Sequence, residues 1–437
     1  ARAMADDAKI LILDEPNSAL NMYETEILFR LIREQTAKGM TILYISHRMD
    51  EVFEISDRIT VMRDGRYIKT LNTADTNVDE IISLMLGHDT RCVYARSSGE
   101  RGDVVLDVEH LTVASKLHKK NAVRDVSFSL RAGEVLAVVG ESGCGKSVLC
   151  KSILRLLPQT ARIKSGEILV DGTDIAGYRE RDMRALRGKL FSMVFQDPMT
   201  ALDPTMTVGA QIAEAVLVHQ PKLEKAQVRK RVIELMGLVG IGRPEERMGL
   251  YPYHFSGGMR QRVVMAIALA GNPRILFADE PTTALDVTIQ AQILELLREI
   301  QRKLGTATVF VTHDLGVVAR VADRVAVMYA GKIVETGTAE EIFYDPRHPY
   351  TWGLLRSLPA LSRGKATLPT IPGMPPTLID PPKGDAFACR NEYALAIDYE
   401  EEPPMFRITD THYAATWLLD PRAPKITPPM GGNRHEG

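Results

Sequence analysis

Short apolar runs separated by amphipathic stretches alternate along most of the chain. Four of these runs, VLAVV (135–139), MVF (193–195), ILFA (275–278) and TVFVT (308–312), are short and almost wholly apolar. Continuous apolar runs of this length are typical of parallel strands buried on both faces by helices. The pattern therefore predicts an α/β fold.

Between Thr205 and Asn272 the apolar spacing changes to that of a helix. One helical face collects Val228, Val232, Leu235, Met236 and Val239. We therefore expect a helical subdomain over about residues 205–272, inserted into the α/β domain.

An internal repeat crosses the chain. KILILDEPNSAL (9–20) parallels RILFADEPTTAL (274–285), and residues 41–70 parallel residues 308–336. The offset is 265 residues at the acidic pair and 266 residues at the histidine that follows. Only the second copy is preceded by further sequence of the same domain type, so the first copy is expected to be a partial domain.

These changes of pattern divide the chain into four expected segments. They are a partial domain (1–88), a linker (89–102), a complete domain (103–358) and a proline-rich arm with a terminal extension (359–437).

The net charge of −2 gives no bulk signal for binding nucleic acid or anionic lipid. No apolar run approaches the roughly 18 residues that a spanning helix needs, so we expect any membrane association to be peripheral and to act through a partner. The four cysteines are widely spaced, which favours a reducing compartment over a disulfide scaffold.

A glycine-rich loop follows the first buried strand of the second copy. It runs Gly140, Glu141, Ser142, Gly143, Cys144, Gly145, Lys146, Ser147 and Val148, and it fits the pattern GxxxxGK[ST] between a strand and a helix. In such loops successive backbone N–H groups wrap phosphates. Lys146 is expected to reach the β- and γ-phosphates of a nucleotide, and the Ser147 hydroxyl to bind Mg²⁺. A simple glycine-rich turn is the alternative.

Polar side chains end three other predicted strands. Asp279 and Glu280 end one of them, where one carboxylate can hold Mg²⁺ and the other can polarise water. Gln196 and His313 follow two more. Taken singly, each of these residues is more often structural.

Ser256, Gly257 and Gly258 precede the helical stretch RQRVVMAIALA. The N-terminus of a helix that begins with such small residues can bind an anion, so this is a second predicted anion-binding site after the phosphate loop.

In this order the segments resemble the ABC ATPase family, with FSGGM in place of the commoner LSGGQ signature. The resemblance implies a P-loop NTPase (RecA-like) core with a β-subdomain and a helical subdomain, working as a head-to-tail dimer on Mg-ATP. Glu280 is then the general base, and His313 contacts the γ-phosphate. Gln196 joins Ser147 and Asp279 around Mg²⁺. The D-loop carries Asp286, and Ser256, Gly257 and Gly258 serve the partner's site.

Residues 103–430 resemble more closely the ATPases of oligopeptide and dipeptide importers. The segment DPRHPYTWGLLRSLP (345–359) is specific to that group and begins its terminal extension. The resemblance implies a second ABC ATPase subunit in a heterodimer, two transmembrane permease subunits, an extracytoplasmic solute-binding protein acting indirectly, and no nucleic acid. It places the chain on the cytoplasmic face of a bacterial-type membrane.

Two positions depart from that group. Many relatives hold an iron–sulfur cluster on three spaced cysteines of the extension, where this chain has Asp385, Asn391 and Asp398. Cys389 falls out of register, and one thiolate cannot hold a cluster, so we expect none. The window where relatives carry an adenine-stacking aromatic contains only His118, which is either a weak stacker or part of a solvated basic loop.

The partial domain differs in type. YISHRMDEVFEISDRITVMRDGRYI, in residues 1–88, resembles the sugar-importer ATPases of the ribose and galactose type. Asp14, Glu15 and His47 have no phosphate loop beside them in sequence, so we assign this copy no nucleotide site.

Three alternatives stay open for the whole chain. The first is the same motor driving sugar or metal-chelate import, and the second is an ABC ATPase that does not act in transport. The third is a non-catalytic partner, which Lys146 and Glu280 argue against.

A separate expectation concerns Cys144, whose nearness to Lys146 and to a helix N-terminus predicts a lowered thiol pKa and reactivity toward alkylating agents. A buried, inert sulfur is the alternative there.

Overall fold

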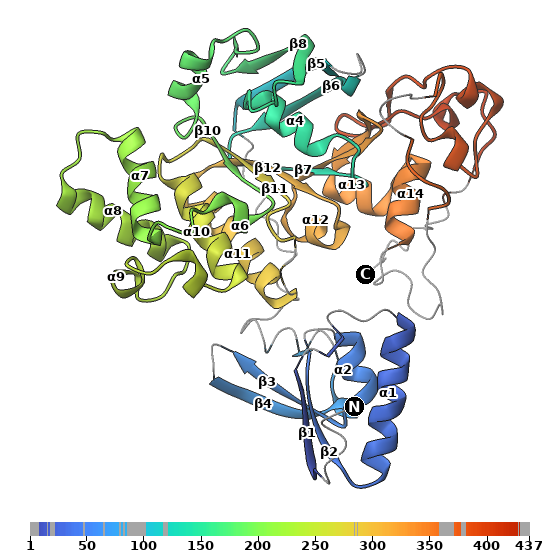
Figure 1. Cartoon of the computed structure of the whole chain (residues 1–437). Helices are drawn as coiled ribbons and strands as arrows, with labels where there is room; N and C mark the ends of the chain where they lie inside the picture. Colours follow the sequence, from blue (N-terminus) through green and yellow to red (C-terminus); the bar gives the residue numbers. More distant parts are fainter. Residues whose placement is uncertain are drawn as a thin grey trace. The chain divides into compact units, whose positions relative to one another are not determined.

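The computed structural model describes residues 8–14, 16–17, 22–46, 49–63, 66–77, 80–81, 84, 102–116, 121–283, 285, 287–357, 371–376, 382–426 and 428. The chain divides into two compact units (Figure 1). The smaller unit comprises residues 1–97 and 284–293, and the larger unit comprises residues 98–283 and 294–437.

The main sheet of the larger unit has eight strands. Their order across the sheet is β10 (Phe191–Val194), β11 (Ile275–Asp279), β12 (Ala307–Thr312), β7 (Val135–Val139), β13 (Arg324–Tyr329), β14 (Lys332–Thr338), β16 (Tyr413–Ala414) and β15 (Phe406–Arg407). The first five are parallel, and the last three pair antiparallel. All residues of β7, β11 and β12 are buried, which confirms the strands expected from the continuous apolar runs.

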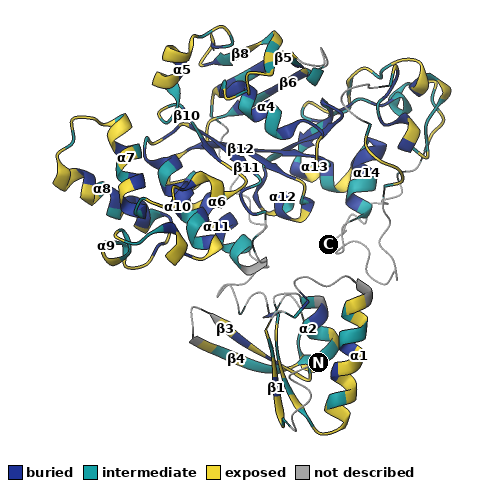
Figure 2. Ribbon diagram, in the orientation of Figure 1, coloured by how far each residue is buried: buried dark blue, intermediate teal, exposed yellow. Residues whose placement is uncertain are grey.

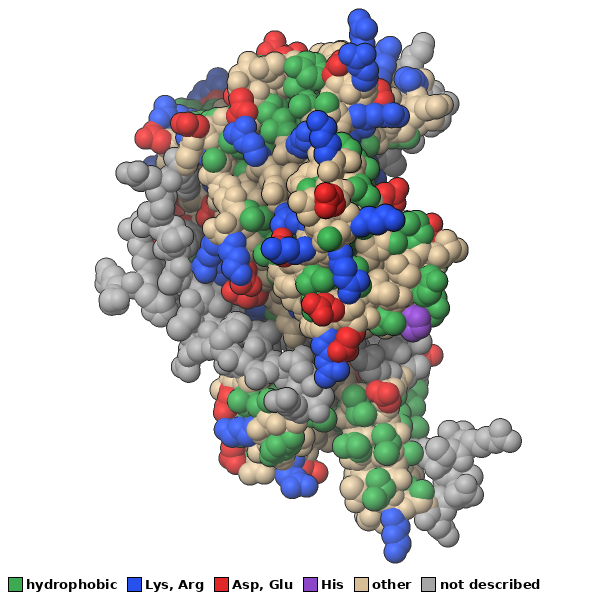
Figure 3. Space-filling view, turned by 90° about the vertical axis from the view of Figure 1, so that its left-hand side faces the viewer, with side chains coloured by type: hydrophobic (Ala, Val, Ile, Leu, Met, Phe, Trp, Pro, Cys, Tyr) green, Lys and Arg blue, Asp and Glu red, His purple; other side chains and the backbone are tan. Residues whose placement is uncertain are grey.

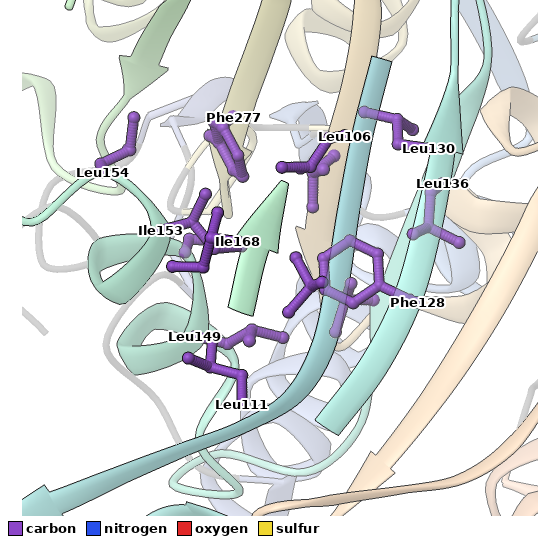
Figure 4. Packing of buried hydrophobic residues seen from close by; sticks show 14 of the residues in the cluster. Leu106, Leu111, Phe128, Leu130, Leu136, Leu149, Ile153, Leu154, Ile168 and Phe277 are labelled. Atoms are coloured by element: carbon purple, nitrogen blue, oxygen red, sulfur yellow. The ribbon is translucent and has the colours of Figure 1, made fainter. Parts of the chain in front are cut away.

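A second, antiparallel sheet packs against the first. Its strands are β6 (Asn121–Arg131), β5 (Val104–Ser115), β8 (Ala161–Val170) and β9 (Thr173–Asp174), in that order. One buried hydrophobic cluster joins the two sheets, and Figure 4 shows Leu106 and Phe128 of the second sheet in the same cluster as Phe277 of β11. Leu149 and Ile153 of α4 (Lys146–Ile153) complete it. This sheet is the expected β-subdomain.

The helical insertion is present where the sequence predicts it. It contains α7 (Val208–His219), α8 (Lys225–Leu238), α9 (Pro244–Arg247), η4 (Pro252–His254) and α10 (Gly257–Leu269). The apolar face expected on α8 is buried, because Val228, Val232, Leu235, Met236 and Val239 are each at most 6% exposed. Figure 1 shows these helices gathered beyond β10, at one end of the main sheet.

Four further helices of the described chain follow β11 in sequence. They are α11 (Val287–Leu304), α12 (Leu315–Val321), α13 (Ala339–Tyr344) and α14 (Pro349–Arg356). Two short helices, α5 (Glu180–Leu186) and α6 (Pro198–Ala201), flank β10 in sequence.

The terminal extension is joined to the larger unit at the opposite end of the main sheet from the helical insertion (Figure 1). It contains η6 (Ala388–Arg390), η7 (Ala396–Tyr399) and η8 (Trp417–Leu419). Its β16 pairs with β14, and Phe387 lies in the same buried cluster as Tyr329 and Tyr350. Glu402 forms ion pairs with Arg124 and Lys332.

The described residues of the smaller unit form two separate two-stranded sheets. Within residues 1–97 its described elements are β1 (Ile10–Asp14), α1 (Met22–Ala37), β2 (Thr41–Ile45), α2 (Met49–Ile55), β3 (Arg58–Arg63), β4 (Arg66–Asn72) and η2 (Thr73–Asp75). Strands β1 and β2 are parallel, and β3 and β4 are antiparallel.

The sequence repeat is also a repeat of structure. Asp14 pairs with Ile45 in the first copy as Asp279 pairs with Val311 in the second. The register shift between Val61 and Met62 recurs between Val327 and Met328. The strand order differs between the copies, because β7 lies between β12 and β13, whereas no strand in the described part of the smaller unit lies between β2 and β3.

Among the helices that the structure describes, none has both the length and the apolar character needed to cross a membrane. Figure 3 shows Lys and Arg side chains interspersed with Asp and Glu over the face that it presents.

Candidate active site

The phosphate loop connects β7 to α4, as its sequence predicts. Gly140 has a φ of 154° and Gly145 a φ of 108°, in a region that side chains rarely allow. A Cβ at Gly140 would lie 2.1 Å from the carbonyl oxygen of Met328, and one at Gly145 would lie 2.7 Å from that of Ala122. The two glycines therefore let the loop lie close to neighbouring backbone.

Lys146 is the first residue of α4 and is 5% exposed. Its ammonium group donates hydrogen bonds to the carbonyl oxygens of Gly140 at 2.7 Å and Glu141 at 2.9 Å. The charged group thus lies within the loop, where it can meet the phosphates that the loop would wrap.

Ser147 and Asp279 come together from α4 and the end of β11. The Ser147 hydroxyl donates to Asp279 Oδ1 at 2.8 Å. Burial raises the pKa of the Asp279 carboxyl, and the hydrogen bond from Ser147 opposes that shift. Oxygen donors with one carboxylate, completed by substrate phosphates, are the ligands that Mg²⁺ prefers, so these two side chains fit that ion. Within the described residues no group of three or more His, Cys, Asp or Glu side chains is arranged to hold a metal ion.

Glu280 is the centre of a polar cluster. Its carboxylate accepts hydrogen bonds from Gln196 Nε2 at 2.9 Å and from the Thr283 hydroxyl at 2.9 Å. His313 Nδ1 lies 3.3 Å from its other oxygen. The sequence predicted Gln196, Glu280 and His313 from the ends of three different strands, and the sheet brings all three together.

The backbone of Glu280 is held in an unusual conformation. Its φ is 46°, and its N–H donates to the carbonyl oxygen of Val311 at 2.9 Å. Non-glycine residues in this region are uncommon and cluster at functional sites. The side chain is only 13% exposed, so the carboxylate is aimed by the surrounding structure.

A cavity of about 760 Å³ lies over these groups. Its lining includes Gly140, Glu141, Ser142, Gly143, Gly145, Lys146, Ser147, Val148, Gln196, Glu280, Thr283 and His313. One cavity therefore contains a phosphate-type loop, an ammonium group, a site suited to Mg²⁺ and a carboxylate placed to accept a proton from water.

The sequence also assigned Ser256, Gly257 and Gly258 to a nucleotide contact, but in the partner's site. Ser256 is the N-cap of α10. None of the three is among the described residues that line the cavity. Asp286, Glu15, His47 and His118 lie outside the described residues, so their predicted roles stay predictions.

The expected lowering of the Cys144 thiol pKa is wrong. Burial raises the pKa of the Cys144 thiol above its usual value, although Lys146 lies close enough to lower it. The residue is 5% exposed and its sulfur lies 3.8 Å from Lys146 Nζ. Desolvation of the thiolate outweighs the nearby positive charge, so Cys144 is the buried sulfur that was the alternative.

Sequence reasoning missed several residues of the site. The Thr283 hydroxyl donates to the Glu280 carboxylate, and its place three residues after Glu280 is the one local signal that could have indicated it. Leu354, Ser357 and Ile371 line the cavity from α14 and the segment after it. Their contribution depends on how distant segments pack, which no spacing in the sequence reveals.

Comparisons with known protein families divide the larger unit into two matches. The family described as "ABC transporter" matches residues 123–283, and the family described as "Oligopeptide/dipeptide transporter, C-terminal region" matches residues 334–397.

Individual relatives extend these matches. The oligopeptide transport ATP-binding protein OppD of Bacillus subtilis is 58% identical over 329 residues, which cover 74% of this chain and 92% of the relative. The dipeptide transport ATP-binding protein DppD of Lactococcus lactis is 56% identical and is covered to 93%. Among solved structures, cbiO1 from Clostridium perfringens, part of the ABC transporter complex cbiONQ, aligns with a TM-score of 0.50 and 31% identity, covering 56% of this chain and 92% of that one.

The geometry of the site and the extent of the matches therefore indicate the same family. The chain is an ABC-type ATPase that belongs to the family of ATP-binding subunits of oligopeptide and dipeptide transporters.

Proposed function

We propose that this chain binds and hydrolyses Mg-ATP in the cavity between Gly140 and His313 to drive import of dipeptides or oligopeptides across a membrane. The observation that carries the chemistry is the convergence of the phosphate loop and Glu280 on one cavity of about 760 Å³. The support for peptides as the solute comes from relatives that are named for peptide transport and match the chain over more than nine-tenths of their length.

In this proposal the phosphate loop and Lys146 hold the phosphates. Ser147, Asp279 and Gln196 would hold Mg²⁺, which neutralises charge that develops on the phosphates. Glu280 orients the attacking water and takes its proton, and His313, which faces the same carboxylate at 3.3 Å, contacts the γ-phosphate.

Hydrolysis is proposed to need a second, related ATPase subunit. The signature residues Ser256, Gly257 and Gly258 do not line this chain's cavity in the described structure, and the head-to-tail dimer of the family would bring a partner's signature to it. Two permease subunits and an extracytoplasmic solute-binding protein would complete the importer, with this chain on the cytoplasmic side.

Two finer assignments remain proposals. The extension is proposed to hold no iron–sulfur cluster, since Asp385 and Asp398 are buried carboxyl groups and Cys389 is exposed.

Residues 1–88 are proposed to be a partial ABC domain. Its sugar-importer type rests on the sequence motif alone and gains no support from the comparisons.

The test of the proposed function is solute uptake. The full chain, co-expressed with the permease subunits of its transporter, should support ATP-dependent uptake of labelled dipeptides or tetrapeptides into membrane vesicles. Lys146→Ala should abolish this uptake. Uptake of ribose or of a metal chelate without uptake of peptide would contradict the proposed solute class.

A further inference from the structure

Glu141, the second residue of the phosphate loop, is held by groups from two other parts of the larger unit and by Lys146 of the same loop. Arg390 of the extension binds its carboxylate with both terminal nitrogens, Nη1 to Oε2 at 2.6 Å and Nη2 to Oε1 at 2.9 Å. The Glu141 N–H donates to the hydroxyl of Tyr350 in α14 at 2.8 Å. Its carbonyl oxygen accepts from Lys146. A paired arginine–carboxylate contact of this kind is among the stronger polar interactions in proteins, and it fixes geometry as well as energy.

Arg390 is itself fixed from several sides. Its side chain is 5% exposed, and its Nε donates to the carbonyl oxygen of Pro372 at 2.8 Å. Nη1 also donates to the Tyr329 hydroxyl at 3.2 Å, and the guanidinium carbon lies 5.8 Å from the centre of that ring. The ion pair with Glu141 raises the pKa of Arg390 further, so the group stays charged. Removing one partner of a buried pair leaves the other charge uncompensated, which is costly.

The contact lies at the wall of the proposed nucleotide cavity. Glu141 lines that cavity, and so does Ile371, which directly precedes the Pro372 that Arg390 binds. Leu354 of α14 lines it as well. Arg390 does not itself line the cavity, so it is placed to act on the loop and not on a reacting atom.

The proposed nucleotide site depends on a glycine-rich loop, and glycine restricts the backbone less than any other residue. Three of its residues are glycines with positive φ. A binding loop that is already fixed in its bound conformation loses less entropy when its ligand arrives, and therefore binds more tightly. Within the described residues Glu141 is the side chain of this loop that is anchored by an ion pair to a segment far along the chain, 249 residues away.

We propose that the terminal extension positions the phosphate loop through the Arg390–Glu141 pair, so that ATP affinity depends on the extension being docked. This inference rests on the proposed assignment of residues 140–148 as the ATP site. Arg390 is a positioning residue, and its loss should weaken ATP binding and raise KM while changing kcat little. Because such coupling is reciprocal, bound ATP should also stabilise the docked position of the extension.

The test uses the full chain and a double-mutant cycle. ATP affinity is measured by titration calorimetry for the wild type, Glu141→Gln, Arg390→Lys and the double variant. We expect Glu141→Gln to weaken binding about tenfold, which is about 1.4 kcal/mol. Arg390→Lys, which keeps the charge but not the paired geometry, should have a smaller effect. The double variant should be no worse than Glu141→Gln alone. Arg407→Lys is the matched control, because this exposed arginine pairs with Asp410 in the same extension.

Two further readouts separate positioning from folding. Thermal unfolding identifies any variant that fails to fold, and Glu141→Gln, which keeps the size of the side chain, remains informative if Arg390→Lys fails. In the assembled transporter, Arg390→Lys should raise the KM for ATP and leave kcat within about twofold of the wild-type value. Lys146→Ala tests the site itself: if it binds ATP like the wild type, the proposed function fails. If Lys146→Ala loses ATP while folded Glu141→Gln and Arg390→Lys both bind within twofold of the wild type, only the positioning role is overturned.

Discussion

The two copies of the repeat contain the same strands but bury them differently. Ile10 and Ile12 of β1 are 65% and 62% exposed, and Leu43 and Ile45 of β2 are 54% and 45% exposed. Their counterparts in β11 and β12, Ile275, Phe277, Val309 and Val311, are all 0% exposed. Figure 2 shows β11 and β12 in the buried colour, whereas β1 carries exposed residues.

The difference lies in what covers this face. In the second copy it packs against α4 and the antiparallel sheet, through residues such as Leu149, Ile153 and Leu106. Those elements precede the repeated segment in sequence, and the described part of the smaller unit contains no counterpart of them. An apolar strand in the sequence therefore indicates a strand that is buried in the complete domain. The strand is buried in a given copy only where the elements that cover it are also present.

The absence of these elements also changes the surroundings of the carboxylate at the end of the first strand. Asp279 receives a hydrogen bond from Ser147, which the phosphate loop places beside it. Asp14 occupies the equivalent end of β1 and is exposed. In the proposed nucleotide site the Asp279 carboxylate has a phosphate loop beside it, whereas the described part of the smaller unit contains no such loop next to Asp14.

The largest expected effect is on hydrolysis. Glu280→Gln should lower the rate of phosphate release by the assembled transporter by a factor of about 10² to 10⁴ while ATP binding is retained, because the amide cannot take the proton from water. The equivalent change in the first copy, Glu15→Gln, should leave the rate unchanged. Wild-type turnover by Glu280→Gln would remove Glu280 from the role of base.

The next effect concerns stability. Phe277→Ala should destabilise the larger unit by about 3–5 kcal/mol, because it opens a cavity in the core. Ile12→Ala, at the equivalent position of β1, should cost less than about 1 kcal/mol, because the side chain is already exposed. Both tryptophans, Trp352 and Trp417, belong to the larger unit, so urea unfolding followed by tryptophan fluorescence reports that unit and circular dichroism reports the whole chain. Equal costs for the two substitutions would mean that the face of β1 is covered after all.

The smallest effect is expected from removing the first copy. Deletion of residues 1–88 should leave ATP affinity within about twofold of the full chain, since the proposed site draws on none of these residues. The soluble yield should rise, because exposed apolar strands promote aggregation. If the remaining chain no longer folds, as judged by circular dichroism, the first copy has a structural role in the folding of the larger unit.

The sequence predicted the parts of the molecule that local pattern controls. The strands at 135–139 and 275–278 agree with the structure to within one residue, because a strand buried on both faces is apolar throughout. Lys146, Asp279 and Glu280 were found because the phosphate loop and the strand ends fix their positions locally.

Long-range packing accounts for what the sequence did not predict. Arg390 meets Glu141 across 249 residues, and Ile371 reaches the cavity from a segment that composition describes only as proline-rich. Cys144 shows the same limit, because its neighbours in sequence favour the thiolate while its burial, which only the fold determines, disfavours it.

The central claim is that the chain has one nucleotide site and that the second copy contains it. Calorimetric titration of the full chain with Mg-ATP tests this claim directly, using Lys146→Ala in the second copy and Asp14→Asn in the first. The account predicts one ATP per chain for the wild type and for Asp14→Asn, and none for Lys146→Ala. A second equivalent of ATP in the wild type, loss of binding in Asp14→Asn, or undiminished binding by Lys146→Ala would contradict it.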